Sequence, residues 1–176
     1  MDRIRNYNIA FTGLKNGKHD FIFDVKQEFF NLFEAEQEFD NAKLNVKVLL
    51  EKHSSFLDFK ITVEGTVDLI CDISNEIFKY PICSELKVLV KFGEVYDDSH
   101  EEIINIPEHE HEFNIAQLIF ETTVLAIPMK KIAPTLTDKD LEILNQYAPK
   151  ESKEVQQTEA KIDPRWSALD KLRKKN

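Results

Sequence analysis

The densest group of ionisable side chains lies in residues 93–112. This segment holds eight Asp and Glu, no Lys or Arg, and three of the five histidines: His100, His109 and His111. Imidazole and carboxylate groups are zinc ligands, and two histidines spaced by two residues would share one side of a strand. A solvated acidic loop has the same composition, however, and the spacing matches no metal-ligand signature closely. The segment therefore predicts no metal site, and it suggests instead a surface for a basic protein.

Nucleophilic and acid–base chemistry find little support in the sequence. Cys71 and Cys83 are twelve residues apart, form no Cys-x-x-Cys and are expected in the core, where cysteine packs as a small apolar residue. Neighbouring carboxylates lie in the most polar stretch, whereas general acid–base catalysis needs a concave, partly dry site. We therefore expect no enzyme, no cofactor and no small-molecule substrate.

The last fifteen residues, 162–176, have the features of a short amphipathic helix. Asp163 is a suitable N-cap and Pro164 suits the first helical position. Three apolar side chains recur at helical spacing, namely Trp166, Leu169 and Leu172, and four cations that favour the C-terminal end of a helix follow: Lys171, Arg173, Lys174 and Lys175. A helix of this length is unstable alone in water, so the apolar side chains need a surface to pack on. That surface is either the protein's own sheet or a partner anchored by Trp166.

The charge of the chain is unevenly distributed. The 176 residues contain 23 Lys and Arg against 32 Asp and Glu, a net charge of −9. Residues 161–176 carry six cations against two Asp, a net +4, so residues 1–160 carry −13. An acidic body does not favour binding of duplex RNA, because such binding needs clustered cations. Contacts with nucleic acid are therefore expected from the basic end of the chain.

The composition also limits the class of protein. Four Gly and no G-x-G-x-x-G or G-x-x-x-x-G-K-S/T string exclude the common phosphate-binding loops. Two Cys do not form a disulfide framework, residues 1–6 lead into no apolar signal segment, and no apolar run approaches the ~20 residues that span a bilayer. We therefore expect a cytosolic protein without a membrane partner.

Hydrophobic periodicity predicts an α+β fold. Apolar and polar residues alternate over 44–50, 57–63, 67–71 and 86–92, which is typical of an antiparallel sheet with one dry face. A hairpin joining 4–11 to 20–25 is expected at the N-terminus, followed by a short helix within 26–39. The period changes to helical over 113–127, where Asn114 and Gln117 have capping-box spacing and Pro128 favours the helix end. This helix should pack across an antiparallel sheet or partly open barrel, with Leu125 on its buried side.

Three parts are expected along the chain. Residues 1–148 form the body, in which Thr137 caps a short helix over 138–147. Residues 149–161 are polar and charged with little to bury, and are expected to be a flexible linker. Residues 162–176 form the basic tail helix.

Three segments together resemble a known family. They are residues 63–72 (VEGTVDLICD), the helix end at 121–128 (ETTVLAIP), and residues 162–169 (IDPRWSAL). In this order they resemble the YceD family of large ribosomal RNA subunit accumulation proteins. Many relatives carry Cys-x-x-Cys at the central strand, whereas here Ser74 stands at the second position, which removes support for a thiol or zinc role. The closing motif is intact, so the resemblance carries over to Asp163, Pro164, Arg165 and Trp166.

The resemblance implies a role in the accumulation of large-subunit ribosomal RNA, and hence in ribosome assembly. We expect a non-enzymatic factor that binds ribosomal RNA or a large-subunit ribosomal protein through its tail. The alternative is a general protein-interaction adaptor that uses the Trp166 motif and has no connection with ribosomes.

Overall fold

The computed structural model describes residues 4–100 and 102–135. The chain divides into two units, Met1–Thr137 and Asp138–Asn176, and all the described residues belong to the first. The helix expected over 138–147, the linker and the tail helix lie outside the described residues.

A six-stranded mixed sheet forms the body, in the order β2-β3-β4-β5-β7-β6. The strands are β2 (Gly17–Lys26), β3 (Asp40–Lys52), β4 (Phe56–Ile70), β5 (Ile77–Gly93), β6 (Asp97–His100) and β7 (Ile103–Pro107). From β2 to β5 each pair is antiparallel, whereas β7 runs parallel to β5 and antiparallel to β6. The prediction of a purely antiparallel sheet was therefore wrong at this end, and the sheet is open rather than closed into a barrel.

The alternating pattern predicted the central strands correctly. Residues 57–63 and 67–71 belong almost entirely to one long strand, β4, which continues through Gly65 instead of turning there. Alternate side chains of β3 and β4 are buried, including Val46, Leu50, Phe59 and Ile61. Because successive side chains point to opposite faces of a strand, one face of the sheet forms the core and the other meets solvent.

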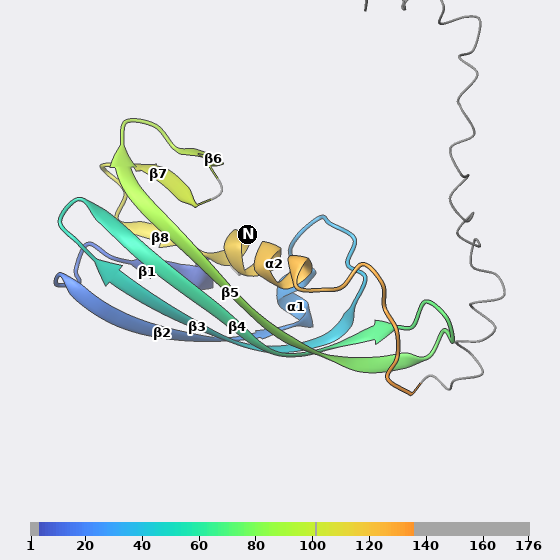
Figure 1. Cartoon of the computed structure of the whole chain (residues 1–176). Coiled ribbons are helices and arrows are strands. Elements are labelled where there is room, and N and C mark those ends of the chain that lie inside the picture. Colours follow the sequence, from blue (N-terminus) through green and yellow to red (C-terminus); the bar gives the residue numbers. More distant parts are fainter. Residues whose placement is uncertain (1–3, 101, 136–176) are drawn as a thin grey trace, which may run out of the picture. The chain divides into compact units, whose positions relative to one another are not determined.

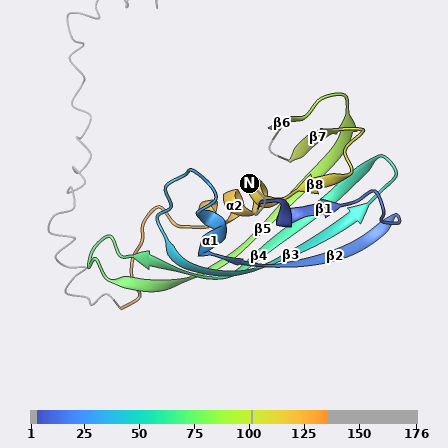
Figure 2. The same ribbon diagram turned by 180° about the vertical axis from the view of Figure 1, so that it is seen from behind.

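The two α-helices cover the concave, buried face of the curved sheet, as Figures 1 and 2 show from opposite sides. Helix α2 (Ala116–Leu125) packs on β4 and β5, which confirms the expected buried helix, and it ends within three residues of Pro128. The expected capping box does not form, because Ile115 is the N-cap and makes no side-chain cap hydrogen bond. Asn114 Oδ1 instead accepts from the Ala116 N–H at 2.9 Å, and Gln117 donates to Glu121. Leu125 is 84% exposed, so its predicted burial was wrong.

Helix α1 (Gln27–Phe30) is much shorter than the helix expected within 26–39. The chain leaves it through tight turns in which the Leu32 and Phe33 N–H groups donate to Phe29 and Phe30. Instead of continuing as a helix, this segment packs through its aromatic rings. Phe33 stacks on Phe120 of α2 with ring centroids 4.3 Å apart. Phe30 is fully buried in this cluster, and its ring contacts Phe39 edge-on.

The predicted N-terminal hairpin was wrong. After a short 3₁₀ turn, η1 (Ile4–Tyr7), strand β1 (Asn8–Ala10) pairs with the distant strand β8 (Glu112–Asn114) in a separate two-stranded sheet. β2 pairs with β3 instead. The segment between β1 and β2 holds turn-forming residues as expected, but the two strands that flank it belong to different sheets.

Lys52, at the end of β3, holds this segment in place. Its Nζ atom donates to the carbonyl oxygens of Phe11 at 2.7 Å and Leu14 at 2.9 Å. We expect Lys52→Met to lower the free energy of unfolding by about 1–3 kcal/mol, because two carbonyls lose a charged donor. Urea denaturation measures the change, and Lys91→Met, at an exposed position of β5, is the control. Equal stability of the two variants would contradict this role.

Candidate functional site

The ten residues of the predicted tail site, Asp163 to Lys175, lie outside the described residues. Their assignment to a partner or RNA site stays a prediction. The second candidate, the acidic segment 93–112, is described except for residue 101.

The acidic segment is more ordered than the solvated loop that its composition suggested. It contains β6 and β7, and Ile104 and Ile106 of β7 are buried with exposed fractions of 6% and 3%. These isoleucines attach the segment to the core through parallel pairing of β7 with β5. The acidic side chains that the structure describes as exposed are Glu94, Asp98, Glu102, Glu108, Glu110 and Glu112.

Local hydrogen bonds favour negative charge on part of this surface. The Asp97 carboxylate accepts from the Ser99 N–H at 3.0 Å, and hydrogen bonds from the Ser99 side chain and backbone lower the pKa of Asp97. Burial raises the pKa of Tyr96, and the neighbouring Asp98 carboxylate raises it further. Asp97 is therefore an anion at neutral pH, while Tyr96 remains a neutral phenol.

The end of the acidic segment lines a cavity of about 580 Å³. Glu108, Glu110 and His111 line it together with Lys52 and His53. The His111 carbonyl accepts from the Phe11 N–H at 3.1 Å, and its ring Nδ1 lies 3.3 Å from the Thr12 hydroxyl. The sequence did not predict Lys52 or His53 here, because the arrangement depends on where the N-terminal segment crosses the end of β3.

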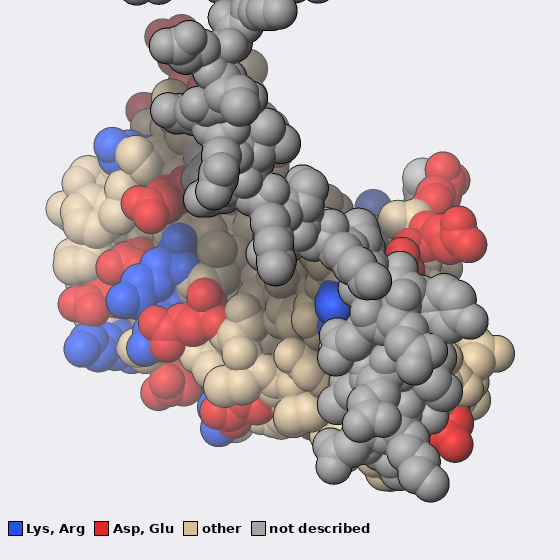
Figure 3. All heavy atoms as spheres, turned by 45° about the vertical axis from the view of Figure 1, so that its right-hand side comes forward, with Lys and Arg blue, Asp and Glu red and all other residues tan. Residues whose placement is uncertain are grey.

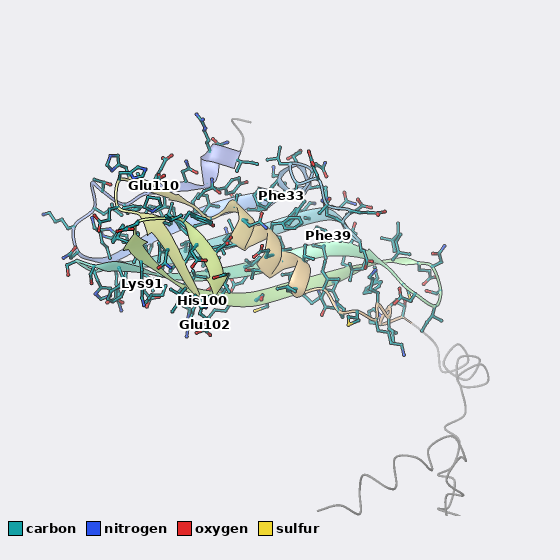
Figure 4. The ribbon with its side chains drawn as sticks, turned by 90° about the horizontal axis from the view of Figure 1, so that it is seen from above. Phe33, Phe39, Lys91, His100, Glu102 and Glu110 are labelled. Carbon is teal, nitrogen blue, oxygen red and sulfur yellow. The ribbon has the colours of Figure 1, made fainter. Side chains whose placement is uncertain are left out.

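Among the described side chains, the histidines of the segment belong to no cluster of metal ligands. Within the described ranges no group of three or more His, Cys, Asp and Glu side chains is placed to hold an ion. Figure 4 shows Glu110 away from His100 and Glu102, although all three lie at the same end of the sheet. The labelled carboxylates Glu102 and Glu110 are therefore separate from each other.

The two cysteines have different environments. Cys71 is 1% exposed, as predicted, and its Sγ accepts from the Ala133 N–H at 3.3 Å. Burial raises the pKa of this thiol, but hydrogen bonds from Ser74 and from the Ala133 and Ile73 N–H groups lower it to about 7. Cys83 is exposed, so its predicted place in the core was wrong. The thiol with the lowered pKa is thus closed off from solvent.

Thiol labelling tests this difference. We expect a maleimide reagent to modify Cys83 rapidly in the native protein and Cys71 only after unfolding, because only accessible thiolates react. Mass spectrometry of native and urea-treated protein measures the labels, and Cys83→Ser should remove the rapid one. Equally rapid labelling of Cys71 would show that the Ala133 segment opens readily.

The solvent-facing side of the sheet carries both charges in pairs. Lys47 lies 3.0 Å from Glu64, and Lys60 lies 2.9 Å from Glu85. In Figure 3, cationic and acidic side chains lie side by side among the described residues of the face shown. Lys47 and Lys60 are therefore already neutralised by neighbouring carboxylates on this surface.

In the described part, no helix is both long and apolar enough to cross a membrane.

Of three comparisons with known proteins, one gives a match. No curated protein and no solved structure matches the chain. The profile of one family, described as large ribosomal RNA subunit accumulation protein YceD, matches residues 59–173, from within β4 through the Asp-Pro-Arg-Trp motif. Because this match spans well over half of its residues, the chain belongs to the YceD family.

Proposed function

We propose that this protein supports the accumulation or maturation of large-subunit ribosomal RNA by binding RNA or a ribosomal protein, without catalysing a reaction. The observation that carries the proposal is the family match, which includes both the central strands and the basic tail. The family's description names ribosomal RNA accumulation and no chemical reaction.

In this proposal the tail makes the main contact. Residues 161–176 carry a net +4 and the only Trp of the chain. Tryptophan is a frequent anchor of binding interfaces, and nearby lysines attract phosphates or an acidic protein surface. Residues 1–160 carry −13. The acidic body therefore favours basic partners, whereas the basic tail favours acidic ones.

The acidic segment would add a contact with a basic ribosomal protein. Two of its exposed carboxylates, Glu108 and Glu110, line a cavity that Lys52 also lines, and no Lys or Arg lies within 93–112. A basic partner would be steered to this end by charge complementarity.

Capture from cell lysate separates an RNA partner from a protein partner. The full chain is used as bait with and without nuclease treatment, and ribosomal proteins and ribosomal RNA are quantified. Loss of ribosomal components after nuclease indicates contact through RNA, and retention indicates a ribosomal protein.

Ribosomal RNA profiling in a deletion strain tests the function itself. We expect the ratio of large-subunit to small-subunit RNA to fall when the gene is deleted and to recover on complementation. An unchanged ratio would contradict the proposal and favour a general interaction adaptor.

A further inference from the structure

The N-terminal two thirds of β5 form an open edge of the sheet. β4 pairs with β5 along its whole length on one side, but on the other side β7 pairs only with Leu89–Gly93. Residues 77–88 therefore have no neighbouring strand on that side among the described residues. Figure 1 shows β7 beside only one end of β5. An open edge of this length presents backbone donors and acceptors to another strand.

Hydrogen bonds at the two ends of β5 show which residues face the edge. The Cys71 N–H donates to Glu76 at the hairpin end, so even-numbered residues of β5 bond toward β4. The Leu89 N–H donates to Glu102, and Gly93 accepts from Glu108, so odd-numbered residues bond toward the other side. Since antiparallel strands alternate in this way, the residues whose backbone groups face the open edge are Ile77, Lys79, Pro81, Cys83, Glu85 and Lys87.

We propose that a second copy of this chain pairs with the open edge, so that two β5 strands run antiparallel about a two-fold axis at Ile82. This inference goes beyond the proposed role in ribosomal RNA accumulation and does not depend on it. A two-fold edge pairing is isologous, so each contact occurs twice.

Charge selects this register. With Ile82 opposite Ile82, Lys79 of each copy lies opposite Glu85 of the other, and opposite charges stabilise a cross-strand pair. Moving the axis to Cys83 places Lys79 opposite Lys87, which is repulsive. Moving it to Pro81 places Lys79 opposite Cys83, so the attraction between Lys79 and Glu85 is lost.

The inner face is complementary in the same register. Phe78 lies opposite Leu86 of the other copy, and Tyr80 lies opposite Ser84. Ser84 and Leu86 line a groove of about 490 Å³ between β5 and α2, together with Leu118 and Leu125. Leu125 is 84% exposed in the single chain. A strand added beside β5 would bring apolar side chains next to Leu125 and remove its surface from water.

Charge reversal in the full chain tests both the dimer and its register. Sedimentation over a concentration series should show a dimer for the native protein. Lys79→Glu should raise its dissociation constant about tenfold or more, because two attractive pairs become repulsive. Lys79→Ala, which removes the attraction without adding repulsion, should weaken the dimer less than Lys79→Glu does. Lys43→Glu makes the same charge change at an exposed position of β3 and should leave the dimer intact.

Cross-linking gives a second measurement that needs no charge variant. Cys83 of each copy would lie diagonal to the other, about 7–8 Å apart, within reach of a short bifunctional maleimide. A covalent dimer that Cys83→Ser abolishes supports the proposal. A monomer at every concentration, a Lys79→Glu dimer as strong as the native one, or a Lys79→Ala dimer weaker than the Lys79→Glu dimer would overturn it.

Discussion

Replacing Gly65 by alanine is expected to lower the free energy of unfolding by about 3–5 kcal/mol. Gly65 lies in the middle of β4 with a φ of +157°, a conformation that side chains rarely adopt. A Cβ atom there would lie 2.1 Å from the Lys43 carbonyl oxygen and 2.8 Å from the Leu44 Cα. Both atoms belong to the backbone of β3, so the clash cannot be relieved by moving a side chain. Either β3 shifts away or the central sheet loses part of its pairing.

Gly93→Ala is the matched control for this substitution. Gly93 ends β5, and an added Cβ would make only an ordinary contact, 3.8 Å from the Asn105 Cβ. Urea unfolding of both variants gives the comparison, and we expect Gly93→Ala to change the stability by less than about 1 kcal/mol. Similar losses for the two variants would refute the close approach of β3 at Gly65. Gly65 also lies within the region that matches the family profile.

The sequence predicted the central strands because their burial is one-sided. Buried residues such as Val46, Leu50, Phe59 and Ile61 lie at every second position of their strands. In the helix that covers this face, α2, the apolar residues follow helical spacing instead. These signals are local, since each follows from which face of the element is dry. The pairing of β3, β4 and β5 as hairpins followed from their order along the chain.

The errors lie where pairing is non-local. β1 is three residues long and finds its partner more than 100 residues later, at β8. No property of residues 8–10 indicates that partner, so the turn beside them favoured a hairpin. β7 was overlooked because carboxylates surround it, although Ile104 and Ile106 alternate with Asn105 as in other half-buried strands. A charged segment can therefore belong to the sheet when every second residue is apolar.

The candidate site was predictable in kind but not in position. Composition identified the acidic segment, and the structure shows that β7 attaches it to the core. The open edge of β5 and the exposure of Cys83 could not be predicted, because they depend on where β7 stops pairing with β5. An alternating pattern predicts which face of the sheet a side chain lies on. It does not predict whether its strand has a neighbouring strand on both sides.

Trp166→Ala is expected to reduce capture of ribosomal components by the full chain roughly 30-fold or more, since anchors of this type contribute about 2 kcal/mol or more to binding. Trp166→Phe, which retains an aromatic ring, should lose less. Quantitative capture from lysate measures both variants, with Lys43→Glu as a control on the body. Capture by Trp166→Ala at the native level would show that the tail motif is not the anchor.

The melting temperature of Trp166→Ala distinguishes the two surfaces that the apolar side of the tail could occupy. If Trp166 binds a partner, its removal leaves the unfolding of the body unchanged, because the buried side chains of the central sheet keep all their contacts. If Trp166 packs on the chain's own sheet, its removal lowers the melting temperature, since truncating a buried Trp costs about 3–5 kcal/mol. Salt adds a further criterion: capture through lysine contacts with RNA phosphates should weaken steeply with ionic strength, whereas capture through an apolar protein pocket should change little. Loss of capture with an unchanged melting temperature is thus the result that assigns Trp166 to a partner.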